Sequence, residues 1–230
     1  MTTAAVVVAA GRGERLAASA DGPKALIEVA GRSMVELALT TLRAVPTIHH
    51  MIVVHPPDAE AAFRSVVGDA TLVAGGDTRG GSVRAGLAAL VGEVDVVAIH
   101  DAARPLVPPR VVAEVLRAVR GDVIAAAPGL PVTDTLKRVG DHGDVLVTVP
   151  RRDLWAVHTP QVVRRDVLEV ALALDGADDV TDDLGLVEVV LSTGTVTGRV
   201  RLVRGDPRDL KITYPEDLHL AAAIVRGSSP

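Results

Sequence analysis

Short runs of β-branched and small apolar residues alternate along this chain with longer amphipathic stretches, and this alternation limits the fold more than any other feature. Each short run has the length and composition of a strand that is buried on both faces of a parallel sheet. The amphipathic stretches have the apolar spacing of helices that cover such a sheet. The pattern therefore predicts an α/β fold with a doubly wound, mostly parallel sheet, whose ligands bind beyond the carboxyl ends of the strands.

The alternation predicts where the individual elements lie. The expected strands are Val6–Ala10, Met51–Val54, Val96–His100 and Val123–Ala127, and the sheet is expected to resume near Val200–Val203. The expected helices are Ser33–Arg43, Pro57–Val67, Ser82–Val91, Pro109–Arg120 and Pro215–Val225. Ser33 and Ser82 are predicted N-caps, because a serine hydroxyl accepts from free N–H groups of the first turn, and Pro109 fits a first helical turn.

One segment departs from this alternation. Leu130–Val139 and Val145–Val149 have extended character, and residues 140–144 between them, Gly-Asp-His-Gly-Asp, are typical of a turn. We therefore predict a β-hairpin over residues 130–150, called the arm below. Because a lone hairpin is marginally stable in water, we expect the arm to pack against another surface, such as a partner subunit. The rest of residues 1–230 is expected to form one domain.

The composition excludes several classes of function. The 230 residues include no cysteine, which excludes disulfides, cysteine nucleophiles and cysteine-ligated metals. Acidic residues outnumber basic ones by 29 to 24, and there is one Phe, one Tyr and one Trp, so nucleic-acid binding is not expected. No apolar run approaches the roughly 18 residues of a membrane helix, and the first residues lack a signal-peptide pattern. We therefore expect a cytoplasmic protein that does not bind membranes.

The first expected strand leads into a glycine-rich loop, residues 9–16, and Lys24 follows shortly after. Gly11 and Gly13 allow the tight turn that brings backbone N–H groups close to an anion. The loop is not a dinucleotide fingerprint, because Leu16 replaces the third glycine, and it is not a P-loop, because no Gly-Lys-Ser/Thr follows. Arg15 and Lys24 suit a triphosphate, although a solvated loop with basic residues explains this motif equally well when it is taken alone.

Three further segments add to the case for a phosphate site. Gly75–Ser82 lies between a strand and a helix, so its glycines and the first N–H groups of that helix can approach an anion or an acceptor. Asp101 follows the strand that ends in His100, where a carboxylate could hold Mg²⁺ together with substrate phosphates. Lys211 precedes the last helix. Taken singly, these residues also fit a connecting loop, a capping aspartate, a hydrogen-bonded histidine and a surface lysine.

Taken together, the motifs resemble those of the 2-C-methyl-D-erythritol 4-phosphate cytidylyltransferases, a family of the sugar-phosphate nucleotidyltransferase superfamily in the non-mevalonate isoprenoid pathway. They occur in family order and span nearly the whole chain. The residues that carry the resemblance are Ala9-Ala10-Gly11-x-Gly13-x-Arg15 with Pro23-Lys24, Gly75-Gly76-x-x-Arg79-x-x-Ser82, His100-Asp101-Ala102-Ala103-Arg104-Pro105, Thr159-Pro160-Gln161 and Lys211-Ile212-Thr213.

The resemblance implies both a fold and an activity. The fold is a Rossmann-like three-layer αβα sandwich with a mostly parallel sheet and a protruding β-hairpin arm that crosses to the other subunit of a homodimer. The activity is transfer of a cytidylyl group from CTP to a polyol phosphate, 2-C-methyl-D-erythritol 4-phosphate, with release of pyrophosphate and with Mg²⁺ as cofactor.

The resemblance also implies roles for individual residues. Arg15 and Lys24 match the residues that stabilise the transition state, and Arg151 and Lys211 match those that position the methylerythritol phosphate, with the arginine supplied by the partner's arm. Asp101 matches the magnesium ligand and also a substrate contact. Matches to the nucleotide contacts are Ala9, Ala10, Gly11, Gly13, Gly76, Asp77, Ser82 and Ala102. Matches to further substrate contacts are Arg104, Thr135, Thr159 and Thr181.

Some alternatives stay open. Arg152 stands beside Arg151 and is a second candidate for the positioning arginine, although the spacing to Leu154-Trp155 favours Arg151. A nucleotidyltransferase that acts on a different sugar phosphate, on another polyol phosphate or on molybdopterin would carry the same first loop, and ribitol-type phosphates are the hardest of these substrates to exclude. A non-catalytic nucleotide sensor would need the glycine-rich loop, but not Asp101, Arg151 and Lys211 together. The broken glycine pattern disfavours a dinucleotide-dependent oxidoreductase.

Overall fold

The computed structural model describes residues 1–11, 16, 22–174 and 181–227, and its centre is an eight-stranded sheet. The strands follow the order β10-β7-β11-β6-β1-β4-β5, and β12 pairs with β7. β10 and β11 run antiparallel to their neighbours, and the other pairings in the sheet are parallel. The strands are β1 (Thr3–Val8), β4 (Ile48–His55), β5 (Thr71–Ala74), β6 (Val96–Asp101), β7 (Val123–Pro131), β10 (Trp155–Val157), β11 (Gln161–Arg164) and β12 (Arg199–Arg204).

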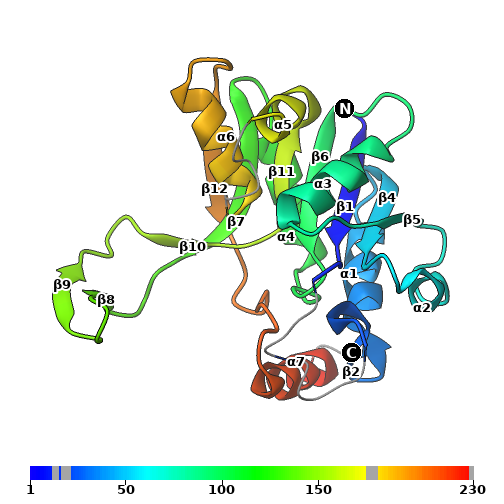
Figure 1. Cartoon of the computed structure of the whole chain (residues 1–230), viewed down its shortest axis with the longest axis horizontal. Coiled ribbons are helices and arrows are strands. Elements are labelled where there is room, and N and C mark those ends of the chain that lie inside the picture. The colour runs from blue at the N-terminus through cyan, green and yellow to red at the C-terminus, as the bar shows by residue number, and fades with distance from the viewer. Residues whose placement is uncertain (12–15, 17–21, 175–180, 228–230) are drawn as a thin grey trace.

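Helices cover both faces of this sheet, as Figure 1 shows. Along β1, Ala4 and Val6 face one apolar cluster and Ala5 and Val7 face the other, because successive side chains of a strand point to opposite faces. One face is covered by α3 (Arg79–Ala88), α5 (Arg165–Leu172) and α6 (Asp183–Ser192), and the other by α1 (Met34–Arg43), α2 (Glu60–Arg64) and α4 (Pro109–Ala118). The predicted three-layer sandwich with a mostly parallel sheet is confirmed.

A smaller apolar cluster closes the carboxyl end of the sheet. It joins Met34 of α1 to Ile212 and to Ala221 of the last helix, α7 (Pro215–Gly227). The same region contains the short 3-10 helix η2 (Lys24–Leu26) and the paired strands β2 (Glu28–Val29) and β3 (Arg32–Ser33). In Figure 1 these elements lie below the sheet, at the end where β1 leads into the glycine-rich loop.

Of the three helix starts predicted from capping residues and proline, two are confirmed and one is wrong. Ser33 caps α1 in a capping box with Glu36, and Pro109 lies in the first turn of α4. Ser82 is not an N-cap, because α3 begins earlier: the Oγ1 atom of Thr78 accepts from the N–H of Gly81, at 2.9 Å, and Ser82 is buried inside the helix. The cap at Thr78 starts the helix despite the low helix propensity of the two glycines that follow.

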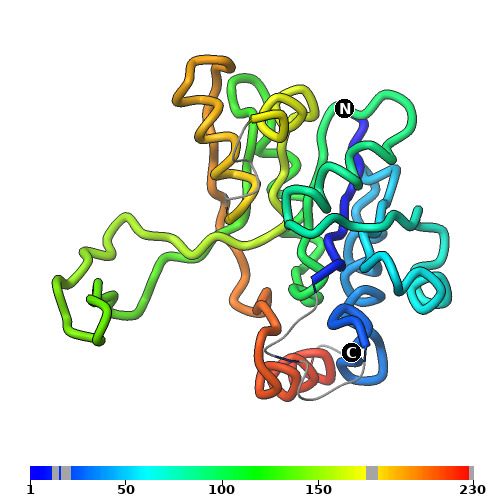
Figure 2. The backbone as a smooth tube through the Cα atoms, in the orientation of Figure 1, coloured from blue at the N-terminus to red at the C-terminus, as the bar shows by residue number. Residues whose placement is uncertain are grey.

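The predicted hairpin is present and extends away from the body. β8 (Leu136–Val139) and β9 (Val145–Val149) pair antiparallel as a separate two-stranded sheet. The first half of the segment differs from the prediction, since residues 130 and 131 still belong to β7 and pair with β10 at the root of the arm. Figure 2 shows the chain leaving β7, turning at the far end of the arm and returning to β10.

Within the described residues, no helix has the length and apolar character needed to cross a bilayer.

Candidate active site

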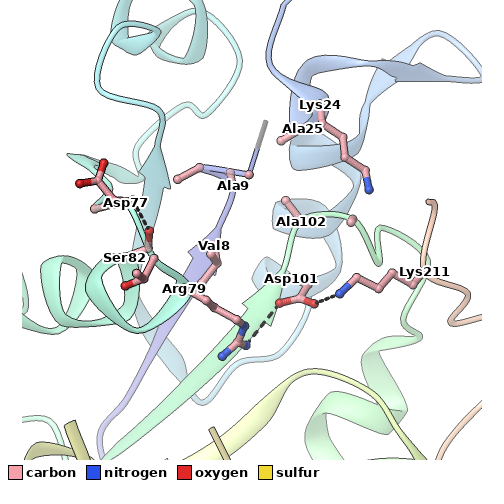
Figure 3. Close-up of a pocket in the computed structure, with 15 residues that line it drawn as sticks. Val8, Ala9, Lys24, Ala25, Asp77, Arg79, Ser82, Asp101, Ala102 and Lys211 are labelled. Atoms are coloured by element: carbon pink, nitrogen blue, oxygen red, sulfur yellow. Dashed lines mark hydrogen bonds and ion pairs between the residues drawn. The ribbon is translucent and has the colours of Figure 1, made fainter. Parts of the chain in front are cut away.

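A cavity of about 330 Å³ opens at the carboxyl edge of the sheet, where β1 and β6 end and α3 begins. This is the edge at which ligands bind in doubly wound folds, and the volume is in the range of small-molecule sites. Five separate segments of the chain surround this space, and Figure 3 shows their side chains together. The residues that line the cavity are Val8, Ala9, Ala10, Gly11, Lys24, Ala25, Gly76, Asp77, Thr78, Arg79, Ser82, Asp101, Ala102, Ala103 and Lys211.

Two backbone segments form one wall of the cavity, and they approach each other closely. A Cβ atom on Gly75 would lie 2.6 Å from the Cβ of Ala10 and 2.9 Å from the Oγ of Ser82, so a larger residue does not fit there. The close approach brings the end of β1 beside the first turn of α3. The free N–H groups at such a helix N-terminus favour an anion or an acceptor atom of a ligand.

Asp101 ends β6 at the cavity wall and is held by two cations. Its Oδ2 atom accepts from Nζ of Lys211 at 2.9 Å, and its Oδ1 atom lies 3.3 Å from Nη2 of Arg79. Burial alone would raise the pKa of the Asp101 carboxyl, but the charges of Arg79 and Lys211 lower it to about 2. Asp101 is therefore an anion at neutral pH and can bind a cation.

Arg79 is itself anchored by Asp183, and neither role was predicted from the sequence. The two side chains form a bidentate pair, with both N···O distances 2.8 Å, and Asp183 is fully buried in the first turn of α6. Arg79 lies inside a motif that indicated the site, so its position was a usable signal. No comparable signal in the sequence indicated Asp183, because 104 residues separate it from Arg79 along the chain.

A buried chain of hydrogen bonds supports Asp101 from behind. The backbone N–H of Asp101 donates to Oγ1 of Thr159, and that hydroxyl lies 3.0 Å from Nδ1 of His100. Nε2 of His100 lies 3.1 Å from the carbonyl oxygen of Arg104 and must donate to it, so the hydroxyl of Thr159 donates to Nδ1. Burial lowers the pKa of His100 to about 4, which keeps the ring neutral. The sequence interpretation of His100 as a hydrogen-bonded histidine is confirmed.

A second set of contacts holds the segment that carries Lys211. The carbonyl oxygen of Asp209 accepts from Nη1 of Arg104 at 2.9 Å, and its carboxylate lies 3.0 Å from Nδ1 of His158. The N–H of Ile212 donates to the carbonyl of Ala103 at 2.8 Å. Hydrogen bonds to the backbone of Asp209 and Ile212 thus hold the chain on both sides of Lys211. The side chain of Lys211 extends toward Asp101 (Figure 3).

The structure brings ten of the predicted site residues together around the cavity: Ala9, Ala10, Gly11, Lys24, Gly76, Asp77, Ser82, Asp101, Ala102 and Lys211. Arg104 and Thr159 lie behind the cavity wall, in the two hydrogen-bonded sets above. Thr181 precedes the N-cap of α6 and does not line the cavity, and Thr135 and Arg151 lie in or beside the arm. Gly13 and Arg15 fall outside the described residues.

Comparison with known proteins assigns the family. The model of the 2-C-methyl-D-erythritol 4-phosphate cytidylyltransferase family matches residues 3–227. The chain belongs to this family. Among curated cytidylyltransferases, the protein of that name from Saccharopolyspora erythraea is 43% identical over 232 residues, which cover 98% of this chain and all of that protein. A bifunctional IspD/IspF enzyme from Clavibacter michiganensis is 46% identical, and the match covers 96% of this chain and 53% of that enzyme.

Solved structures of cytidylyltransferases have the same fold. The enzyme from Thermus thermophilus matches with a TM-score of 0.78 and 33% identity, covering 98% of this chain and 100% of that one. The 4-diphosphocytidyl-2C-methyl-D-erythritol synthase from Anaerococcus prevotii matches with a TM-score of 0.80 and 26% identity over 98% of each chain. The predicted family resemblance and the predicted fold class are both confirmed.

Proposed function

We propose that this protein transfers the cytidylyl group of CTP to 2-C-methyl-D-erythritol 4-phosphate, giving 4-diphosphocytidyl-2-C-methyl-D-erythritol and pyrophosphate. Membership of the cytidylyltransferase family supports the reaction. The observation that carries it at the site is the ionised Asp101 at the end of β6, in one cavity with Lys24, Lys211 and the N-terminus of α3. An anionic metal ligand and several cations around one space suit a reaction between two phosphorylated substrates.

The chemistry needs no covalent enzyme intermediate and no general base. A phosphate oxygen of the polyol phosphate attacks the α-phosphorus of CTP, a new P–O bond forms, and the bond to the bridging oxygen breaks so that pyrophosphate leaves. The attacking phosphate has a second pKa near about 6, so it is mostly ionised at neutral pH. The barrier is therefore the approach of one anion to another, and the protein lowers it by positioning and by supplying positive charge.

The cations divide this work by their positions. Lys24 lines the cavity beside the glycine-rich loop and would stabilise charge on the triphosphate and the leaving pyrophosphate, together with Arg15. Lys211 reaches the cavity from the segment before α7, with its ammonium group at Asp101, and would hold the attacking phosphate. Arg151 would act on that same phosphate. It lies next to the arm, so its action fits a site completed by the arm of a second subunit.

Asp101 fits a role as the protein's ligand for Mg²⁺. The described residues contain no group of three His, Cys, Asp or Glu side chains that could hold a metal ion. Mg²⁺ sites that involve nucleotides commonly use one or two carboxylates, with substrate phosphates and water as the other ligands, so a single ionised carboxylate is sufficient. The bound ion would supply positive charge to the α-phosphate.

Backbone groups would select the pyrimidine. The residues assigned to CTP, which include Gly76, Asp77 and Ser82, lie along the loop and the first turn of α3. None of the described residues that line the cavity is aromatic, so base recognition by hydrogen bonds at the edge of the ring fits better than stacking. CTP carries a 4-amino donor where UTP carries an acceptor, and a site built for one leaves groups unpaired with the other.

A homodimer formed through the arm is part of the proposal. The strands of the arm expose Val139, Val145, Leu146 and Val147, with side chains 50% to 64% exposed. An exposed apolar ribbon of this kind suits burial against another surface, and the proposed role of Arg151 needs the arm of one subunit at the cavity of the other.

The test is a pyrophosphate-release assay with CTP, Mg²⁺ and a panel of methylerythritol, ribitol and glycerol phosphates. We expect release with methylerythritol phosphate, and loss of release when UTP replaces CTP or when EDTA removes the metal. Faster release with ribitol phosphate would instead assign the enzyme to another polyol phosphate. CTP binding without release on any member of the panel would assign a nucleotide sensor.

A further inference from the structure

Arg79 and Asp183 have no part in the proposed chemistry, although Arg79 contacts the predicted metal ligand and Asp183 holds Arg79. Arg79 lines the cavity, and its guanidinium joins two carboxylates, with Asp183 bound through both oxygens and Asp101 through one. Figure 3 shows the arginine side chain reaching Asp101 from the side opposite Lys211. Asp101 thus receives one cation on each of its carboxylate oxygens.

Asp183 is fixed in place by contacts that do not involve the cavity. Its backbone N–H donates to Oε1 of Gln161 at 2.8 Å, and the N–H of Leu184 donates to the same oxygen at 3.0 Å. Gln161 belongs to β11, which pairs with β6 and places this residue opposite Ile99, close to the strand end at Asp101. The contacts therefore form a closed ring through β6, β11, α6 and α3. Such a ring gives Arg79 little freedom to move.

The two cations on Asp101 differ in how firmly they are held. The side chain of Arg79 is 27% exposed and is anchored by the bidentate pair with a fully buried carboxylate. The side chain of Lys211 is 49% exposed, and its ammonium group donates to Oδ2 of Asp101. A compact ammonium on a flexible stem can move to a substrate phosphate more readily than a planar guanidinium in a bidentate pair.

We propose that Arg79, held by Asp183, is a positioning residue that fixes the Asp101 carboxylate by its Oδ1 atom and leaves Oδ2 to face the cavity. Lys211 occupies Oδ2 in this structure, and the metal ion would take that oxygen when the substrates bind. The inference rests on the proposed function, because it gives Arg79 its effect through Asp101. It assigns Arg79 a role in the reaction without contact to the reacting atoms.

A purely structural pair and a direct substrate contact would each behave differently from a positioning pair. If Arg79 and Asp183 only join α3 to α6, their loss lowers stability and leaves the turnover of the folded protein unchanged. If Arg79 contacts a substrate directly, its loss lowers turnover whether or not the Asp101 carboxylate is present. A positioning role alone makes the effect of Arg79 depend on that carboxylate.

The decisive measurement compares Arg79→Gln in two backgrounds, the natural sequence and Asp101→Asn, in single-turnover assays with the dimer in excess. We expect a loss of about 10- to 100-fold in the first background, the scale for residues that orient a metal ligand. In the second background we expect less than about threefold further loss. An equal loss in both backgrounds, or full activity of folded Arg79→Gln, would overturn the proposal.

Two further variants distinguish a loss of turnover from a folding defect. Asp183→Asn keeps the shape of the side chain, and we expect it to lower turnover about as much as Arg79→Gln and to add nothing when the two are combined. Arg43→Gln is the matched control. Its side chain is 35% exposed and joins α1 to Asp69 outside the cavity, so we expect a lower Tm with unchanged turnover. Additive losses from Arg79→Gln and Asp183→Asn would contradict the proposal.

A readout without turnover tests the anchoring itself. In a nitrogen-15 NMR spectrum, the guanidinium NH₂ groups of an arginine held by two carboxylates rotate slowly and give separate signals. We expect separate signals for Arg79 in the natural protein and averaged signals in Asp183→Asn. Unchanged signals in that variant would show that Asp183 does not anchor Arg79. If the natural protein releases no pyrophosphate in the substrate panel, the proposed function fails instead, whatever the NMR result.

Discussion

The cavity and the arm are built in contrasting ways. Around the cavity, every oxygen of Asp101 and Asp183 has a cation or a donor within the same chain, and the residues behind them are buried. On the arm, the two strands pair with each other and with no other described strand, and several of their apolar residues are exposed. The described part of the cavity is held together by contacts within one chain. The arm carries an apolar surface that the described residues of this chain leave exposed.

This contrast divides the proposed site between two kinds of residue. Lys24, Asp101 and Lys211 are brought together by the fold of a single chain. Thr135 and Arg151 lie in or beside the arm, which extends away from the body in Figure 1, so they stand apart from the cavity of their own chain. Four predictions test this contrast, and three of them compare a residue with a matched control position.

The largest effect is expected at the cavity. Lys24→Ala should lower turnover by about 100-fold or more, the scale for loss of a group that stabilises the transition state. Lys137→Ala is the matched control on the arm, where the ammonium group donates to Thr148, and its turnover should stay within about threefold of the natural protein. Near-normal turnover of Lys24→Ala in pyrophosphate-release assays would remove Lys24 from the chemistry.

The next effect concerns stability at low pH. The pKa of buried His100 is lowered to about 4 from an unfolded value of 6.5, so between these pH values the unfolded state binds the extra proton. The stability that neutral His100 contributes is therefore present above pH 6.5 and is lost as the pH falls toward 4. We expect the difference in unfolding free energy between the natural protein and His100→Gln to fall by about 3 kcal/mol across that window.

Urea unfolding of both proteins at pH 7, 6, 5 and 4 measures this difference. The charges of Asp101 and Arg104 act on the His100 ring. Both residues are present in both proteins, so their own titration largely cancels in the comparison. A difference that stays constant with pH would mean that His100 titrates normally in the folded protein and is not buried as described.

A smaller effect on activity is expected at the root of the arm. Arg151→Ala should raise the KM for the polyol phosphate about tenfold or more, and Arg152→Ala should change it less than about threefold. If the arm acts across the dimer, an equal mixture of Arg151→Ala and Lys24→Ala subunits should regain about a quarter of the natural activity, because half the dimers are mixed and each has one intact site. Absence of rescue after subunit exchange would place Arg151 within its own chain's site.

The smallest effect on subunit stability is expected at the tip of the arm. Leu146 is 64% exposed, so Leu146→Lys should change the unfolding free energy of the subunit by less than about 0.5 kcal/mol while dissociating the proposed dimer. Leu220→Lys, on α7 with the leucine 55% exposed, is the control and should leave the dimer intact. Sedimentation velocity of the two variants separates these outcomes. An intact Leu146→Lys dimer would show that the arm does not form the interface.

Much of the site was predictable because its residues occupy recognisable local positions. Asp101 was placed correctly because an aspartate directly after a buried strand lies at the carboxyl edge of the sheet, whatever the rest of the chain does. Lys24 and the loop that begins at Ala9 follow from the same rule. The hairpin was also predictable, since its turn residues and alternating strands are local features.

Other features depend on distant parts of the chain. Antiparallel β11 lies between β6 and β7, and the segment just before it places the hydroxyl of Thr159 where it accepts from the backbone N–H of Asp101. The family resemblance had implied only a substrate contact for Thr159. The start of α3 at Thr78 was missed because two glycines follow the cap. The partnership of Arg79 with Asp183 joins residues far apart in sequence, and nothing local distinguishes Asp183 from Asp182 beside it.

The sequence by itself determined the class of fold, the family and the edge of the sheet at which the cavity lies, because apolar periodicity and short motifs are local properties of a chain. Only the tertiary structure decided which charges meet. It placed Arg79 and Lys211 on opposite oxygens of Asp101 and buried Asp183 as the anchor of the arginine. The physical reason is that ion pairs and hydrogen bonds act over a few ångströms, so their partners are known only when distant segments have packed together.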